Sequence, residues 1–205
     1  MALTTPHHQE LTGGDDRRPC ILICNWSATQ PVWDLVEDLS GVPWEPQGVR
    51  TELVDPGQSP AELAISLAER LGRPDVRRLL LVGRTKHDGP VRLQLRAEIP
   101  LHDGQRLSHD GPGIVRSTAP TADILEALAK AHVPAVATSE NEADAGSELL
   151  YDVLSRLDGS LETPAVAMMR FPYLMTEGMI AQAVKSAATV MTQHLTPLPR
   201  FAARA

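Results

Sequence analysis

Apolar residues along the chain fall into short runs and into helical stripes. The short runs, which are continuous or alternate with polar residues, predict strands at Pro19–Cys24, Val49–Val54, Arg78–Val82, Val133–Thr138 and Ala165–Met169. Apolar residues spaced three and four apart predict helices at Pro31–Leu39, Pro60–Leu71, Thr121–Ala131, Ala145–Leu157 and Glu177–Leu195. Strands that alternate with helices predict an α/β fold, a three-layer α/β/α sandwich with a mostly parallel, twisted sheet.

Local signals refine some of these elements. Ser59 is expected to cap the helix that begins at Pro60, and Gly72 stands just past the end of that helix. The strand Arg78–Val82 is expected to end at Gly83. Val91–Ile99 alternates apolar with charged or polar side chains, which predicts an antiparallel or edge strand that is half exposed.

The stretch His132–Leu157 has the form expected of a binding segment. A short apolar run is followed by a polar connection, Ser139–Asp144, and then by the helix that begins at Ala145. In open α/β sheets, the loops at the carboxyl ends of parallel strands form the ligand sites. We therefore expect the run Val133–Thr138 to be a buried strand that leads into such a site.

Length, charge and cysteine content restrict the class of protein. The 205 residues predict one domain at 19–195, between a polar tail at 1–18 and a second tail at 196–205. A net charge of −7 argues against nucleic-acid binding, and no apolar run is long enough for a membrane span. Cys20 and Cys24 lie about 13 Å apart if they share a strand, which is too far for a disulfide. A cytoplasmic location is therefore expected.

Several short motifs follow one another in a suggestive order. They are Gln30–Val36, Leu81–Thr85, Asp110–Pro112, Ser117–Pro120, Ile124–Ala137, Ala145–Leu150 and Met169–Tyr173. In this order they resemble segments of pyroglutamyl peptidase I, the pyrrolidone-carboxylate cysteine peptidases. The resemblance covers about residues 19–195 and implies the fold of that family.

The same resemblance implies that the catalytic triad of the family is absent. The position of the nucleophilic cysteine, one turn into a helix, is Leu150, and the position of the histidine base is Arg170. The position of the orienting glutamate falls near Pro90 or Val91, neither of which is acidic. A guanidinium stays protonated and cannot act as a base at neutral pH. Cysteine peptidase activity is therefore not expected.

A nearby residue could replace the missing chemistry. Cys24 ends the first predicted strand and is a candidate for a relocated nucleophile, with a small buried apolar residue as the alternative. Tyr151 could reach the edge of the pocket, whereas Glu148 is expected to face elsewhere because it lies about 200° from Leu150 on the helix. The candidate bases are His102, His109 and His132.

The exit loops of the strands supply candidate ligand-binding residues. These are Asn25, Trp26, Arg84, Ser139, Asp144, Leu150, Arg170 and Tyr173. An arginine beside a helix N-terminus is suited to an anion, so we expect a small molecule that carries a carboxylate or an amide. In the alternative interpretation, Arg170 forms a structural ion pair with a carboxylate of the acidic segment Glu140–Asp144.

Two classes of function remain open. The first is an enzyme without metal or cofactor that binds its substrate non-covalently and promotes a cyclisation, elimination or rearrangement in a biosynthetic pathway. The second is a catalytically silent binding or interaction module. The Ala-rich final helix could pack on a second copy of the chain to form a homo-oligomer, or on its own sheet.

Overall fold

The computed structural model describes residues 18–26, 44–46, 48–54, 59–99, 101–102, 105–106, 111–157 and 163–193. The strands are β1 (Cys20–Asn25), β2 (Arg50–Val54), β3 (Val76–Thr85), β4 (Val91–Gln94), β5 (Arg96–Glu98), β6 (Leu101–His102), β7 (Gln105–Arg106), β8 (Ile114–Arg116), β9 (Ala135–Thr138) and β10 (Ala165–Pro172). The helices are α1 (Pro60–Leu71), α2 (Thr121–Lys130), α3 (Ala145–Leu157) and α4 (Glu177–Gln193). The helix predicted at Pro31–Leu39 lies outside the described residues.

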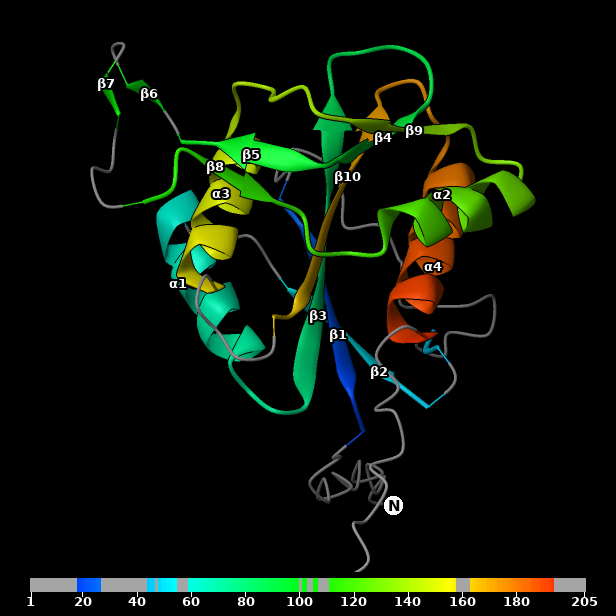
Figure 1. Cartoon of the computed structure of the whole chain (residues 1–205). Helices are drawn as coiled ribbons and strands as arrows, with labels where there is room; N and C mark the ends of the chain where they lie inside the picture. The colour runs from blue at the N-terminus through cyan, green and yellow to red at the C-terminus, as the bar shows by residue number, and fades with distance from the viewer. Residues whose placement is uncertain are drawn as a thin grey trace, which may run out of the picture.

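The main sheet has six strands in the order β2-β1-β3-β10-β4-β9. Strands β2, β1, β3 and β10 are parallel, β4 is antiparallel to β10, and β9 is parallel to β4. Helices α1 and α3 cover one face of this sheet and α2 and α4 cover the other (Figure 1). The three-layer α/β fold and the mostly parallel sheet are therefore confirmed.

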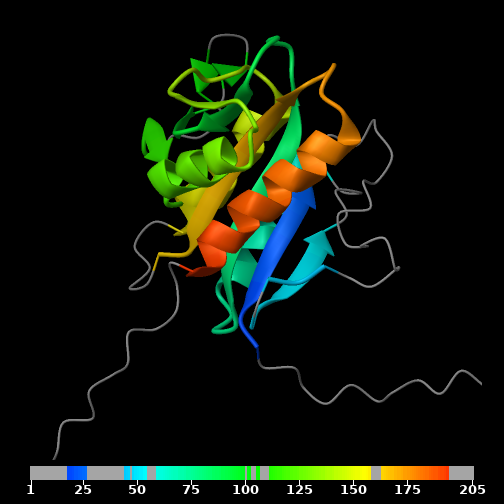
Figure 2. The same cartoon turned by 90° about the vertical axis from the view of Figure 1, so that its right-hand side faces the viewer.

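Each face of the sheet carries its own apolar core. On the α1/α3 face the core includes Leu22, Leu79, Leu81, Val166 and Met168, and on the α2/α4 face alternate residues of the same strands pack under α4. Figure 2 shows α4 running diagonally across its face of the sheet. Because β3 and β10 are covered on both sides, their central parts, at 79–82 and 165–169, are continuous apolar runs. None of the described helices is both long and apolar enough to cross a membrane.

Two strands extend further than predicted. β3 continues through Gly83 to Thr85, and β10 continues through Arg170 to Pro172. The register explains both extensions, because Arg170 pairs with Gly83 and Pro172 with Thr85 in the parallel ladder. Arg170 therefore lies inside a buried strand. The prediction that it lies in an exit loop was wrong.

The strand β9 also departs from the prediction. It lies at the edge of the sheet and runs opposite to the four parallel strands, so its carboxyl end does not point where theirs do. Val136 and Ala137 are exposed, not buried. The segment predicted at Val91–Ile99 is antiparallel to β10 as expected, but it divides at Leu95 into β4 and β5, and β4 lies inside the sheet.

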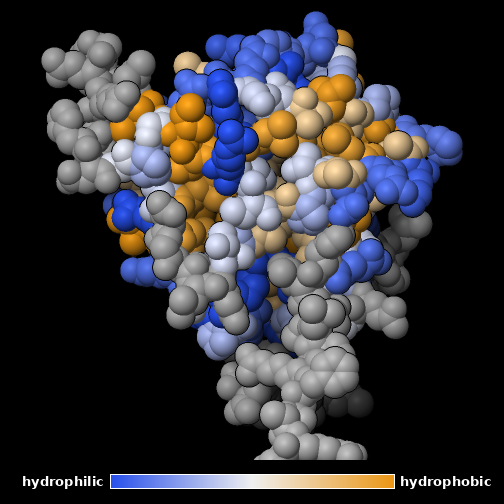
Figure 3. All heavy atoms as spheres, in the orientation of Figure 1, coloured by the Kyte–Doolittle hydropathy of each residue, from blue (hydrophilic) through white to orange (hydrophobic). Residues whose placement is uncertain are grey.

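The surface seen in Figure 3 mixes hydrophobic and hydrophilic residues, with hydrophilic residues at the top of the view, where Figure 1 places the connection from β3 to β4. A few large apolar side chains are exposed. They include Ile114 at 49% and Leu174 at 89% exposure. Apolar side chains scattered singly over a surface are normal and indicate no particular partner.

The capping signal at α1 gives a stability prediction. The side chain of Ser59 accepts from the backbone N–H of Glu62, and the Glu62 side chain accepts from the backbone N–H of Ser59, which completes a capping box. Ser59→Ala should lower the free energy of unfolding by about 1 kcal/mol in urea denaturation. Ser186→Ala, which removes a hydroxyl bonded to the Gln182 carbonyl inside α4, is the control and should change it by less than about 0.5 kcal/mol. Equal losses in the two variants would contradict a role for the cap.

Candidate functional site

Three neighbouring strands bring Trp26, Gly83 and Arg170 into one row. Asn25 pairs with Val82, and the backbone N–H of Trp26 donates to the Val82 carbonyl at 3.0 Å, so Trp26 continues the register one residue past β1. Gly83 in turn pairs with Arg170. Because side chains alternate along a strand, this row lies on the α1/α3 face, beneath the first turn of α3.

Arg170 is the centre of the site and is completely buried. Its Nη1 and Nη2 donate to the two carboxylate oxygens of Asp144 at 2.6 and 2.8 Å. Nη2 also donates to Oγ of Ser147 at 2.8 Å, and Nε donates to Oε1 of Gln94 at 2.8 Å. The guanidinium carbon lies 5.1 Å from the centre of the Trp26 ring. Each nitrogen of the guanidinium therefore has a polar partner.

Asp144 caps the N-terminus of α3 and also forms the ion pair with Arg170. Its Oδ1 accepts from the backbone N–H of Ser147 at 2.9 Å, which is the pattern of an N-terminal helix cap. A carboxylate at this position is also favoured by the helix dipole. One side chain therefore ties α3 to the middle of the sheet.

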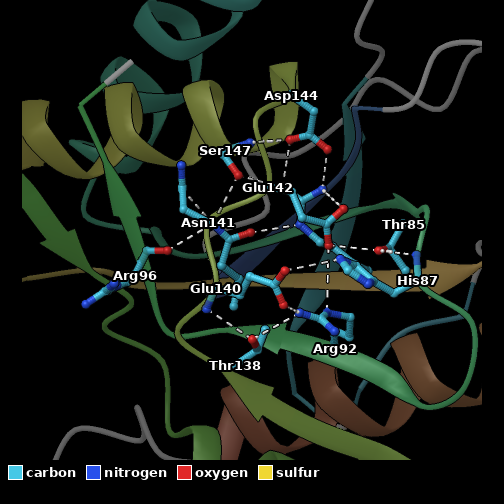
Figure 4. Close-up of polar contacts among 12 residues, drawn as sticks. Thr85, His87, Arg92, Arg96, Thr138, Glu140, Asn141, Glu142, Asp144 and Ser147 are labelled. Atoms are coloured by element: carbon cyan, nitrogen blue, oxygen red, sulfur yellow. Dashed lines mark hydrogen bonds and ion pairs between the residues drawn. The ribbon is translucent and has the colours of Figure 1, made fainter. Parts of the chain in front are cut away.

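A second arginine lies beside the first. Arg92 of β4 pairs directly with Arg170 of β10, and Glu142 lies 3.7 Å from a nitrogen of each guanidinium. Nη2 of Arg92 also donates to Glu140, and the Thr85 hydroxyl donates to Glu142 at 2.8 Å (Figure 4). The carboxylates of the acidic segment thus balance the charges of both arginines.

The energetic consequence is asymmetric. Removing one partner of a buried ion pair leaves an uncompensated charge, whereas a complete pair contributes little more than an apolar replacement would. The Arg170 side chain has no exposed surface, so solvent cannot compensate its charge if Asp144 is lost, whereas the Asp144 side chain is 27% exposed and keeps some contact with solvent. Loss of Asp144 should therefore destabilise the protein more than loss of an exposed ion-pair partner would.

A small cavity opens next to this ion pair. It has a volume of about 160 Å³ and is lined by Glu98, Ile99, Asn141, Glu142, Ala143, Asp144, Ser147 and Glu148. Most of the polar lining groups are carboxylates or carry a hydrogen-bond-accepting oxygen. Oδ1 of Asn141 already accepts weakly, at 3.4 Å, from Gln94 and from the backbone of Glu98. The cavity therefore presents acceptors, and not positive charge, to a ligand.

Of the residues singled out from the sequence, the structure brings together Trp26, Asp144 and Arg170. Arg84 is buried in β3 and donates to the Pro172 carbonyl at 2.9 Å. Its neighbour in the ladder is Phe171, which belongs to the α2/α4 core, so Arg84 faces away from Arg170. Burial lowers the pKa of the Arg84 guanidinium, and the nearby Tyr173 and Glu177 offset part of this effect.

Other predicted residues lie at the margins or in the core. Asn25 is the last residue of β1, beside the row. Ser139 is exposed, and its carbonyl accepts from Nε of Arg96 at 2.9 Å. Tyr173 is 60% exposed. Leu150 is fully buried in the α1/α3 core, and Val91 is buried in the α2/α4 core. Neither Leu150 nor Val91 lines the small cavity.

The candidates for replacement chemistry are also placed. Cys24 has no exposed surface and packs in the α1/α3 core, and the hydroxyl of Tyr151 donates to the Pro112 carbonyl at 2.7 Å. His132 is exposed and has a φ of 56°. The other cysteine, Cys20, has a thiol whose pKa is raised to about 11 by burial. The His109 position and the His102 side chain lie outside the described residues.

Sequence reasoning missed several residues of the site. Gln94, Ser147, Arg92 and Glu98 were not among the candidates, and Glu148 was expected to face elsewhere. Glu142 was considered only as a member of the acidic segment. Glu148 does lie on the opposite side of α3 from Leu150, but the cavity lies on that side. Gln94 carried no signal of its own, because it occupies one of the regular polar positions of the alternating segment Val91–Ile99.

A larger hollow lies on the other face of the sheet. It measures about 580 Å³ between α2 and α4, and its lining includes Trp44, Asp123, Glu126, Lys130 and Lys185. Nζ of Lys185 lies 5.8 Å from the centre of the Trp44 ring. The charges around it are mixed, and Glu126 pairs with Lys130 along α2. Among the described residues, no group of three or more His, Cys, Asp or Glu side chains is placed to hold a metal ion.

Comparisons with known proteins agree with this architecture. Solved structures align over most of the chain, whereas no protein-family model and no curated protein sequence matches it. The pyroglutamyl peptidase I of Bacillus amyloliquefaciens aligns with 85% of this chain and 95% of its own, at 19% identity and a TM-score of 0.63. The chain has a pyroglutamyl-peptidase-like fold.

Other solved structures support the same fold. The pyrrolidone carboxyl peptidase of Fervidobacterium islandicum aligns with 86% of this chain and 99% of its own, at 17% identity and a TM-score of 0.68. A mutant pyrrolidone carboxyl peptidase of Pyrococcus furiosus gives the same coverage, with 16% identity and a TM-score of 0.65. The chain thus shares this fold at less than 20% sequence identity, and the fold is the one that the motif resemblance predicted.

The buried ion pair gives a second prediction. Arg170→Met and Asp144→Asn should each lower the free energy of unfolding, by about 3–5 kcal/mol for Asp144→Asn, which leaves the fully buried guanidinium without its main counter-charge. A double-mutant cycle in urea should show that the double variant loses less than the sum of the two single losses. Lys130→Met, which breaks the exposed pair with Glu126, is the control and should cost no more than about 1 kcal/mol. Losses that simply add would contradict the coupling.

Proposed function

We propose that this protein is not a cysteine peptidase and that it binds a small, amide-containing molecule in the cavity beside Arg170. The observation that supports this best is the chemistry of the site. The guanidinium at the position where the family has its base is already bonded to Asp144, Ser147 and Gln94. The side chain at the nucleophile position, Leu150, is a buried hydrocarbon. Neither can form or resolve an acyl-enzyme.

Relocated nucleophiles receive little support. The Cys24 thiol has no exposed surface, so a substrate carbonyl could reach it only if the α1/α3 core opened. The phenol of Tyr151 is buried and bonded to a backbone carbonyl. Cys20 lies four residues before Cys24 on the same strand, and its raised pKa keeps the thiol protonated at neutral pH.

The residues that line the cavity favour an amide ligand over a carboxylic acid. Glu98, Glu142, Asp144 and Glu148 all face it, and their charges would oppose a carboxylate ligand. An amide N–H, in contrast, would meet oxygen acceptors. The volume of about 160 Å³ is well below the roughly 300–1,000 Å³ of sites for drug-sized molecules. The ligand we propose is therefore a small primary amide or lactam.

Glu148 supports a second candidate, a non-covalent enzyme. Its side chain is exposed at the cavity in the first turn of α3, and the described part of the chain places no ion-pair partner on it. A free carboxylate next to a bound amide could remove a proton during a cyclisation, elimination or rearrangement, as a biosynthetic enzyme would require. If the protein catalyses no such reaction, it is a binding module for the amide ligand.

The first test concerns peptidase activity. Release of the fluorophore from a fluorogenic pyroglutamyl amide should not exceed the rate in buffer, and Cys24→Ser should leave this result unchanged. Leu150→Cys alone should not restore turnover, because Arg170 cannot accept the proton of the thiol. Release that is abolished by iodoacetamide, in the wild-type protein, would overturn the proposal.

The second test compares two ligands with the same carbon skeleton. Glutaramide should bind in ligand-observed NMR titrations, and glutarate should bind more weakly or not at all. Glu148→Ala should weaken glutaramide binding by about 2- to 10-fold, the loss expected for one hydrogen bond. Glu177→Ala is the matched control, because it removes an exposed glutamate from the first turn of α4, away from the cavity. Tighter binding of glutarate than of glutaramide would contradict the amide assignment.

A further inference from the structure

The indole of Trp26 lies in a slot that two glycines make possible. A Cβ atom at Gly83 would stand 2.1 Å from Cε2 of the indole, and a Cβ atom at Gly146 would stand 2.5 Å from the same atom. Both distances are far shorter than any tolerated contact, so only glycine allows the ring at either position. Gly83 belongs to β3 and Gly146 to the first turn of α3, and the slot therefore lies between the sheet and that helix.

The slot also has an electrostatic preference. The guanidinium carbon of Arg170 lies 5.1 Å from the centre of the indole ring, within the range of a cation–π contact. Such a contact favours electron-rich rings. The walls of the slot are thus two flat backbone surfaces and one planar cation, and they suit a flat aromatic group.

Trp26 fits the slot imperfectly. Its indole N–H is buried and finds no acceptor among the described residues. An unpaired buried donor costs free energy that a hydrogen bond to water would recover. The backbone of Trp26 is fixed by its bond to Val82, but the side chain is held by packing and by the contact with Arg170. A ring whose only polar group stands at its rim, where it can form a hydrogen bond to water, would avoid this cost.

We propose that the slot between Gly83, Gly146 and Arg170 is a binding site for an electron-rich aromatic ring, such as a phenol, and that Trp26 is a built-in occupant which the ligand displaces. The site is distinct from the amide cavity, since Gly83, Gly146 and Trp26 do not line that cavity. A protein that uses both would take a ligand with an aromatic ring close to an amide. The ring site does not depend on the amide proposal.

A tryptophan emission experiment tests displacement in the full-length chain. Trp33→Phe with Trp44→Phe leaves Trp26 as the sole tryptophan. Titration with p-cresol, excited where the phenol does not absorb, should shift the emission of Trp26 to longer wavelength in a saturable way. Quenching by acrylamide should rise several-fold, because the indole moves into water. Constant emission and constant quenching up to the solubility limit of p-cresol would overturn displacement.

Cavity variants test the slot itself. Trp26→Gly should bind indole, detected by calorimetry, and should bind p-cresol at least 10-fold more tightly than the wild type because the competitor is gone. Adding Gly83→Ala should abolish both, since its methyl group occupies the slot. The three atoms nearest to that methyl group all belong to Trp26, so the double variant should fold, as circular dichroism can check.

The matched control is Gly113→Ala in the Trp26→Gly background, where the added methyl group meets no atom within 4 Å. This variant should keep full indole binding. Equal indole affinity with and without Gly83→Ala would show adventitious binding and overturn the proposal. Glutaramide titrations of the same variants keep the two proposals apart. If indole binds while glutaramide does not, the ring site stands and the amide site fails, and the reverse result has the opposite meaning.

Discussion

The structure depends most on one requirement, which is that the protein itself compensates the charge of the fully buried Arg170 guanidinium. A charge in the middle of a sheet has to be matched by nearby carboxylates and hydrogen-bond acceptors, because its desolvation is otherwise very costly. Asp144, Ser147 and Gln94 meet this requirement from three separate elements. The side chain of Arg170 therefore links β4, the 139–144 connection and α3 to β10, in addition to the strand ladder and the apolar core.

This requirement also gives the acidic segment a structural role. Glu140, Glu142 and Asp144 project toward Arg92 and Arg170, which lie side by side on antiparallel strands. Two adjacent cations, one fully buried and one partly buried, would repel each other without these anions. The segment thus serves first to neutralise the two arginines. The cavity is the space left between this segment and the first turn of α3.

Elements that depend on local signals were predicted from the sequence, whereas contacts between distant segments were predicted only in part. The ion pair of Arg170 with the acidic segment was one of two interpretations, and it is the one that the structure shows. The bounds of α1 follow from its capping residues and those of α3 from its apolar stripe, and both were predicted correctly. Arg170 was assigned to a loop because a charged residue normally ends a buried strand. The residue that allows its burial, Asp144, lies 26 positions away. The direction of β9 and the contact of Trp26 with Gly83 and Gly146 depend on tertiary packing in the same way.

The arrangement of the ion pair bears directly on function. Apolar side chains of similar volume could fill the space of Arg170 and Asp144 with equal or greater stability, so the pair is not needed for folding alone. Its directional hydrogen bonds do what apolar packing cannot, since they set the orientation of the 139–144 connection and of the first turn of α3. Those are the elements that carry most of the oxygen atoms of the cavity and, at Gly146, one wall of the indole slot. Arg170 thus acts through geometry, by holding in place the walls of the proposed amide cavity and of the proposed ring slot while its own charge stays neutralised.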